Sequence, residues 1–186
     1  MSTFTERAIK ESFIKMLEEQ PLSQITVKAI VEKCGINRNS FYYHFQDIPD
    51  LVEEIVKEFF DEIISRYPSI TVLEDCIEAV LRYSLEHKKT IMHLHNSVNR
   101  DVYEKYLMRF CEYAVTVYID TAYEEEAVGE ADKKMIIRFL KCELFGAYTD
   151  WMSLGMPESA IEELRRLLVL CHGMSEEIIR RCEKNE

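Results

Sequence analysis

Glycine and proline are scarce in this chain, with five glycines and four prolines among 186 residues. So few turn-forming residues predict long helices joined by few connections. No apolar run approaches the ~18 residues that a membrane-spanning helix needs. The polar start, Met-Ser-Thr-Phe-Thr-Glu, does not resemble a signal peptide either, so we expect a cytoplasmic protein with no membrane partner.

Motifs that would indicate an enzyme or a metal site are also missing. The sequence has no nucleophile elbow, phosphate-binding glycine loop, H-E-x-x-H motif or defensible pair of catalytic carboxylates. None of the six cysteines forms a C-x-x-C pair, so we expect reduced and mostly buried thiols. His93 and His95 are two positions apart and would point to different faces of a helix. The sequence therefore predicts no enzymatic activity, no metal and no other cofactor.

Negative charge is distributed unevenly along the chain, whose net charge is -11. Residues 1–46 hold six Lys and Arg against five Glu, whereas residues 47–186 hold 17 Lys and Arg against 29 Asp and Glu. The acidic total argues against a protein that coats nucleic acid non-specifically. The nearly neutral first segment can still bind DNA if its cations and amide groups converge on phosphates. The nearly neutral head (1–46) therefore differs from the acidic body (47–186).

Apolar residues recur at helical spacing along the chain and predict an all-α fold of about nine helices, with a three-helix head and a helical-bundle body. We expect the helices at 3–19, 27–34, 38–44, 48–66, 72–86, 88–96, 100–122, 132–154 and 158–183. Thr26 and Asn37 are the predicted N-caps of the second and third helices. Gly35 should end the second helix, because glycine readily adopts the left-handed conformation found there.

A short helix, a glycine-containing turn and a second short helix occupy residues 26–45 and form a helix-turn-helix. Helical spacing places Phe41 and Phe45 on an inward face and leaves the polar side chains outward. Such a helix fits the DNA major groove, where Arg and Asn bond to bases and aromatic rings touch thymine methyl groups. We expect Arg38, Asn39 and Tyr43 to read bases. The full set of expected DNA contacts is Thr26, Lys28, Asn37, Arg38, Asn39, Ser40, Tyr42, Tyr43 and His44.

Several residues of this segment match a known pattern: Thr26, Ile30, Gly35, Ile36, Tyr42 and Phe45, followed by Leu51. Through them, residues 5–60 resemble the DNA-binding head of the TetR family of bacterial transcription regulators. Val31 and Cys34 stand where the family usually has Ala, and Asn37 replaces a common Ser. Ile48 replaces a Lys that reaches a DNA phosphate in many members. Without that Lys, the slope of log affinity against log salt concentration would be smaller by about one unit.

The resemblance implies a DNA-binding domain at 1–46 and a helical domain for effector binding and dimerisation at 47–186. It also implies a homodimer that binds a pseudo-palindromic DNA operator. In the family, the two closing helices pair with those of a partner, and the apolar segment 132–154 fits that role; the alternative is the core of a monomeric bundle. The expected interface residues are Phe139, Leu144, Phe145, Ile161, Leu164, Leu168, Cys171 and Ile178.

The resemblance also implies a small-molecule pocket in the body, for which aromatic and polar residues are the candidates; the alternative is ordinary packing. The candidates are Tyr83, His87, His93, His95, Asn96, Tyr103, Tyr106, Phe110, Tyr113, Glu143, Tyr148 and Trp151.

Two regulatory functions stay open. The first is a repressor that a small-molecule effector releases from its operator. The second is an activator or co-regulator whose body binds a protein, because residues 145–157 resemble a TetR subgroup that includes an activator of dihydroxyacetone-kinase genes. A cavity in the body would favour the first function, and a solidly packed body would favour the second.

Overall fold

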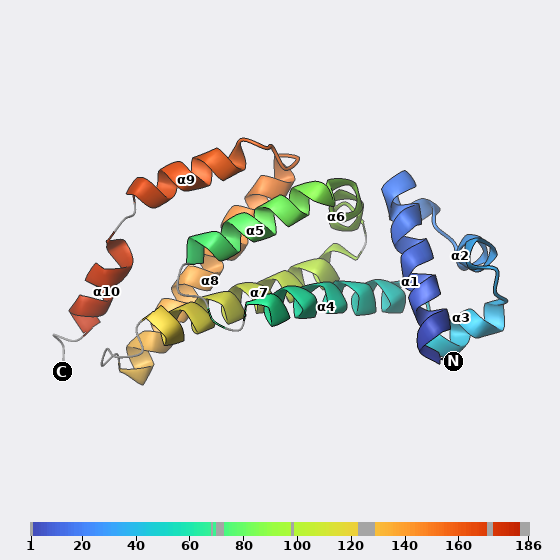
Figure 1. Cartoon of the computed structure of the whole chain (residues 1–186), viewed down its shortest axis with the longest axis horizontal. Helices are drawn as coiled ribbons and strands as arrows, with labels where there is room; N and C mark the ends of the chain where they lie inside the picture. The colour runs from blue at the N-terminus through green and yellow to red at the C-terminus, as the bar shows by residue number, and fades with distance from the viewer. Residues whose placement is uncertain are drawn as a thin grey trace. The chain divides into compact units, whose positions relative to one another are not determined.

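The computed structural model describes residues 2–67, 69, 73–97, 99–122, 129–170 and 173–182. Over these ranges the chain forms ten α-helices, one short 3-10 helix and no strand (Figure 1), which confirms the predicted all-α class. No helix in the described part of the chain is long and apolar enough to cross a membrane. The chain divides into two compact units, the first made of residues 1–62 and 87–106 and the second of residues 63–86 and 107–186.

The first unit holds the helix-turn-helix. Its elements are α1 (Ser2–Glu19), η1 (Leu22–Gln24), α2 (Val27–Cys34), α3 (Arg38–His44), most of α4 (Ile48–Arg66), α6 (Lys88–His95) and the start of α7 (Arg100–Ala122). The observed bounds of α2, α3 and α4 are those predicted from the sequence. Helix α1 contacts α2, α3 and α6. Phe13 and Leu17 of α1 are fully buried, as is the predicted inward residue Phe41.

The two predicted N-caps fix where the short helices begin. The Thr26 hydroxyl accepts a hydrogen bond from the Ala29 amide at 3.2 Å, and the Asn37 side chain accepts one from the Ser40 amide at 2.9 Å. Each bond satisfies a backbone donor that the first turn of a helix leaves without a partner. Gly35 follows α2 with a φ of 70°, in the left-handed region that the sequence predicts. These local bonds set the turn between α2 and α3.

The second unit comprises the end of α4, α5 (Leu73–Glu86), the rest of α7, α8 (Glu130–Ser153), α9 (Ala160–Leu170) and α10 (Met174–Cys182). Helix α5 contacts α9 within this unit. The single helix predicted for 158–183 is wrong, because the structure has two helices, α9 and α10, in its place (Figure 1). Gly173, immediately before α10, has a φ of 82°, which a continuous right-handed helix cannot contain.

The end of α8 is closed by a turn at Gly155, whose φ is 80°. The Met156 amide donates to the Trp151 carbonyl, and the Trp151 indole donates in turn to the Pro157 carbonyl, both at 2.9 Å. This pair of bonds fixes Trp151, the one tryptophan of the sequence, against the chain that follows α8.

The first unit is larger than residues 1–46, since it also takes in most of α4, all of α6 and the start of α7. The functional division of the chain at residues 46 and 47 stays a prediction.

Candidate nucleic-acid interface and interior cavity

Helix α3 presents a polar and aromatic face to solvent. Arg38 and Asn39 are exposed in its first turn, and Tyr42 and Tyr43 expose 53% and 78% of their surface. The opposite face is held by Phe41, whose ring is fully buried. Exposed tyrosines contribute nothing to the core, so their position here is typical of a surface that contacts a partner. The face combines a cation, an amide and two phenols, which are groups that recognise base edges and phosphates.

The remaining expected contacts lie around this face. Thr26, Lys28 and Asn37 are exposed, and Ser40 is half-buried. The Asn37 side chain and the Ser40 hydroxyl lie 3.2 Å apart in addition to the cap bond. Lys28 and Glu32 form an exposed ion pair at 3.8 Å, which is weak enough to exchange for a phosphate.

His44 differs from the other expected contacts. Its side chain is only 7% exposed, and its Nδ1 atom lies 4.0 Å from a carboxylate oxygen of Glu6 on α1. The sequence pattern placed this imidazole outward, but α1 covers it in the structure. The structure therefore contradicts the outward orientation of His44, and its expected DNA contact stays a prediction.

The cations of the head are not equally available to DNA. Arg38 and Lys15 are exposed and have no acidic partner among the described residues. Lys33 and Glu19 lie 3.4 Å apart, as do Arg7 and Glu11. Arg38 is therefore the cation on α3 that can approach DNA without first giving up a carboxylate.

Lys10 is a buried cation whose role the sequence did not reveal. It is 8% exposed, and its ammonium group donates to Glu6 at 2.6 Å and to Glu58 of α4 at 2.7 Å. It also lies 5.7 Å from the centre of the Phe45 ring. Burial alone would lower the pKa of Lys10, but the hydrogen bonds to Glu58 and Glu6 raise that pKa above its ordinary value. Lys10 thus joins α1 to α4 and cannot serve as a phosphate contact.

The second unit contains a cavity of about 400 Å³. It lies between α5, α7, α8 and α9, and its walls are mainly apolar. The lining residues are Cys76, Ile77, Val80, Leu81, Leu107, Phe110, Cys111, Ala114, Glu143, Leu144, Ala147, Tyr148, Asp150, Trp151, Leu154, Pro157, Ala160, Glu163, Leu164 and Leu167. A concave, apolar space with a few polar groups is the usual form of a small-molecule site.

Four of the residues expected in an effector pocket line this cavity: Phe110, Glu143, Tyr148 and Trp151. The Tyr148 and Trp151 rings lie 5.4 Å apart in an edge-to-face arrangement, and the Tyr148 hydroxyl is 2.7 Å from that of Ser84. Sequence reasoning missed the contribution of α5 and α9. The apolar spacing along α5 was a signal for burial, but it carried no information about which residues surround a cavity.

The other candidates lie outside the cavity lining. In the second unit, Tyr83 is half-buried on α5, and the Tyr113 hydroxyl donates to the Tyr67 carbonyl at 3.0 Å. The rest belong to the first unit and include His87, His93, His95, Asn96, Tyr103 and Tyr106.

Within the first unit, several of these candidates have structural contacts. His93 Nδ1 lies 2.5 Å from the Leu17 carbonyl, and the buried Tyr103 ring packs against Phe60. Tyr106 donates to Glu53 at 3.1 Å.

His95 is buried, and burial together with the positive charge of Arg100 lowers its pKa. His87 and Asn96 flank α6 at its two ends.

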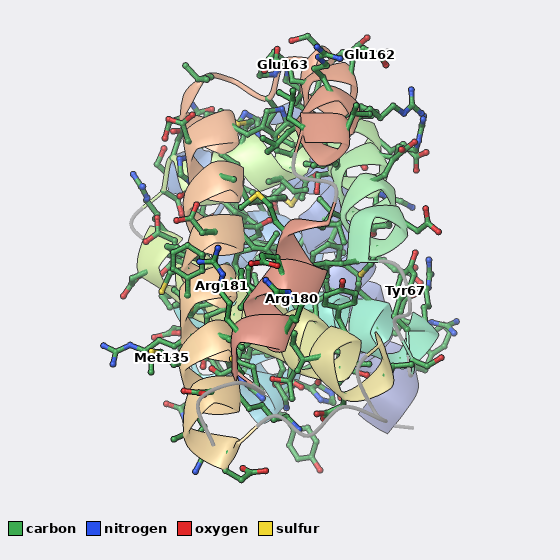
Figure 2. The ribbon with its side chains drawn as sticks, turned by 90° about the vertical axis from the view of Figure 1, so that its left-hand side faces the viewer. Tyr67, Met135, Glu162, Glu163, Arg180 and Arg181 are labelled. Atoms are coloured by element: carbon green, nitrogen blue, oxygen red, sulfur yellow. The ribbon has the colours of Figure 1, made fainter. Side chains whose placement is uncertain are left out.

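The residues expected at a dimer interface lie on α8, α9 and α10. Phe139 is 60% exposed, whereas the other described members of the set are half-buried. Those half-buried members are Leu144, Phe145, Ile161, Leu164 and Ile178. Cys171 and the side chain of Leu168 lie outside the described residues. Met135, one turn before Phe139, projects from α8 (Figure 2) and is 65% exposed.

Two family descriptions match the chain. "Bacterial regulatory proteins, tetR family" matches residues 14–55, which include α2 and α3. "Transcriptional regulator C-terminal region" matches residues 72–173, more than half of the chain. Both descriptions are of transcription regulators and not of enzymes, in agreement with the motifs that the sequence lacks.

Curated relatives match over the head of the chain. The HTH-type transcriptional repressor KstR2 of Mycolicibacterium smegmatis is 34% identical over 55 residues, which are 30% of this chain and 27% of that protein. The HTH-type transcriptional regulator YxbF of Bacillus subtilis is 28% identical over 58 residues, which are 31% of this chain and 15% of that protein. The matched segments thus span less than a third of these relatives.

Two solved structures share the fold over most of the chain. The dihydroxyacetone kinase operon activator DhaS has a TM-score of 0.72 at 19% identity, with 89% of this chain and 94% of that chain covered. NalD, the secondary repressor of the MexAB-OprM multidrug efflux pump in Pseudomonas aeruginosa, has a TM-score of 0.56 at 18% identity, with 91% and 96% covered. Together with the two family matches and the helix-turn-helix, this fold shows that the chain belongs to the TetR family of transcription regulators and carries a helix-turn-helix DNA-binding domain.

Proposed function

We propose that this chain is a homodimeric, sequence-specific repressor that a small molecule releases from its operator. The observation that carries the proposal is the exposed face of α3, where Arg38, Asn39 and two tyrosines point to solvent. A dimer would present two such helices to a pseudo-palindromic operator, with half-sites about one DNA turn apart.

Each exposed group has a role that suits its chemistry. Arg38 and Asn39 are suited to bidentate bonds with guanine and adenine, and Tyr43 is suited to contact with a thymine methyl. Tyr42 and Lys28 are suited to phosphates, because a phenol and an ammonium both donate to phosphate oxygens. The Ser40 hydroxyl and the amides near Thr26 at the start of α2 are suited to further contacts with phosphates of the DNA backbone.

The cavity of the second unit supports control by a small molecule. Leu107 and Phe110 of α7 line it, and the preceding residues of the same helix, Lys105 and Tyr106, both donate to Glu53 of α4. One continuous helix, α7, therefore carries both residues of the cavity wall and the residues that bond to Glu53 of α4. A ligand that changes the position of α7 can change that of α4, and DNA affinity falls if the ligand prefers the altered state.

The DNA-reading role can be tested with an operator selected from random duplexes and a band-shift titration. Arg38→Ala and Tyr43→Ala should each weaken binding by about tenfold or more, since a specific base contact contributes about 1–3 kcal/mol. Arg82→Ala, an exposed arginine on α5 of the second unit, is the matched control and should leave affinity unchanged. Unchanged affinity in both α3 variants would exclude α3 as the reading helix.

The sign of regulation needs a second measurement. The fold resembles that of an operon activator and that of a repressor, each at under 20% identity, so the resemblance favours neither sign. We favour a small-molecule effector over a protein partner because the second unit contains a cavity. A reporter gene behind the selected operator should become more active when this chain is deleted, and a fall in activity would indicate an activator.

A further inference from the structure

The charged groups of the cavity all have the same sign. Three acidic residues, Glu143, Asp150 and Glu163, are part of the lining, which includes no Lys, Arg or His. All three are exposed, so their carboxylates lie at the rim of the cavity and not in its depth. Glu143 and Asp150 are seven residues apart on α8 and therefore lie on one face of that helix. Glu163 comes from α9, where it is labelled in Figure 2.

These carboxylates are not neutralised by neighbouring cations. None of the three forms an ion pair with a Lys or Arg among the residues that the structure describes. Glu163 accepts a hydrogen bond at 2.8 Å from the hydroxyl of Ser159, which is a neutral partner and not a cation. Arg165, two residues further on α9, is occupied by Glu78 and Glu162. The rim therefore carries uncompensated negative charge.

The depth of the cavity is neutral. Burial raises the pKa of Cys76 to about 11 and that of Cys111 to about 12, so both thiols are protonated at neutral pH. The aromatic wall of Phe110, Tyr148 and Trp151 adds apolar surface, and the faces of such rings also attract cations. An apolar body fits this space, whereas an anionic group would meet carboxylates at the rim and find no cation at greater depth.

We infer that the cavity takes an amphipathic organic cation, with its apolar part among α5, α7 and α8 and its positive group at the acidic rim. This inference rests on the proposed function, because it assigns a ligand class to the proposed effector cavity. An amine or a quaternary ammonium on a hydrocarbon or aromatic body has the required chemistry.

The only tryptophan of the chain gives a direct readout, because Trp151 lines the cavity. The full-length protein is titrated with three probes of equal chain length, decyltrimethylammonium, decanol and decanoate, while Trp151 fluorescence is followed. The ammonium probe should bind about tenfold tighter than decanoate, with decanol between them, since a charge near the rim interacts with several carboxylates.

The rim is tested by the triple substitution Glu143→Gln, Asp150→Asn and Glu163→Gln. It should weaken ammonium binding by about tenfold and leave decanol binding unchanged, and the retained decanol binding shows that the variant is folded. Glu158→Gln removes an exposed carboxylate outside the lining and controls for the negative charge of the whole chain. This control should leave the affinity for the ammonium probe as it is.

Tighter binding of decanoate than of the ammonium probe would overturn the inference, and so would an unchanged ammonium affinity in the triple variant. Failure of all three probes to alter Trp151 fluorescence would overturn it as well. The proposed release mechanism fails separately. Suppose that the ammonium probe binds with the expected preference but does not change the band shift with operator DNA. The inferred ligand class is then supported, whereas the proposed control of DNA binding by this cavity is refuted.

Discussion

Lys10 shows how a single residue can have a role that its sequence neighbourhood does not reveal. It follows the buried Ile9 on α1, where helical spacing gives no reason to expect a buried charge. Its partner Glu58 lies 48 residues further along the chain, so the ion pair exists only once α1 and α4 have packed. His44 was expected to face outward, and its burial also depends on another helix, because its neighbour Glu6 lies on α1. Local spacing did place Phe41 and Phe45 correctly.

Replacing Lys10 by methionine should destabilise the head. Lys10→Met keeps most of the side-chain volume but leaves Glu6 and Glu58 without their shared cation, so we expect a loss of about 1–2 kcal/mol in the free energy of unfolding. Because the pKa of Lys10 is raised on folding, its contribution is complete below the ordinary lysine pKa and is lost as the pH rises past the raised value.

Urea unfolding followed by circular dichroism measures this loss. Lys15→Met is the matched control, because Lys15 is an exposed lysine on the same helix without an acidic partner among the described residues. It should change stability by less than about 0.5 kcal/mol. Equal effects of the two substitutions would show that the bonds of Lys10 do not stabilise the fold.

Helices with strong end signals were predicted to the residue. Thr26 and Asn37 cap α2 and α3 with side-chain bonds to nearby amides, and such bonds depend only on sequence separations of three residues. The long helix predicted for 158–183 failed because its apolar stripe continues across Gly173. A single glycine costs a helix only about 1 kcal/mol, so the sequence could not show that this one would take a positive φ.

Gly35 offers a test at the level of the α2–α3 turn. The Gly35 and Ile36 amides donate to the Glu32 and Val31 carbonyls at 3.3 and 3.0 Å, and this closure requires the positive φ of Gly35. A Cβ atom placed there meets no atom within 4 Å, so the cost of a substitution is conformational and not steric. Gly35→Ala should lower the free energy of unfolding by about 1–2 kcal/mol. Gly35→Asn should cost less, because asparagine tolerates the left-handed region, and equal losses in thermal or urea unfolding would refute this reason.

The body of the protein was predicted less well than the head. Of the candidates for an effector pocket, Phe110, Glu143, Tyr148 and Trp151 line the cavity, whereas others such as His93 and Tyr103 belong to the first unit. Which of them contact an effector stays a prediction. The helix-turn-helix lies within residues 26–45, whereas the cavity is bounded by side chains from four helices spread over residues 76–167. Its residue type indicates that an aromatic side chain is buried, but it does not indicate whether that side chain lines a cavity or packs in a solid core.

At the scale of the whole molecule, the apolar surface predicts a dimer. Of the ten large apolar side chains that are strongly exposed in the described part of the chain, seven lie between residues 135 and 174. Phe139 on α8 and Leu170 on α9 are 60% and 66% exposed, and a monomer rarely leaves so many apolar groups of one region in water. We therefore predict that α8 and α9 pair with the same helices of a second copy.

Sedimentation or light scattering at micromolar concentration should give the mass of a dimer for the natural chain and of a monomer for the double substitution Phe139→Glu and Leu170→Glu. Charges on that face would have to be buried without partners in the dimer, which is unfavourable. Phe4→Glu changes another strongly exposed phenylalanine, on α1, and should leave the dimer intact. The monomeric variant should also bind a two-half-site operator at least about tenfold more weakly, because one head then binds without the second. A natural chain that sediments as a monomer, or a double variant that stays dimeric, would show that this apolar surface does not form the interface.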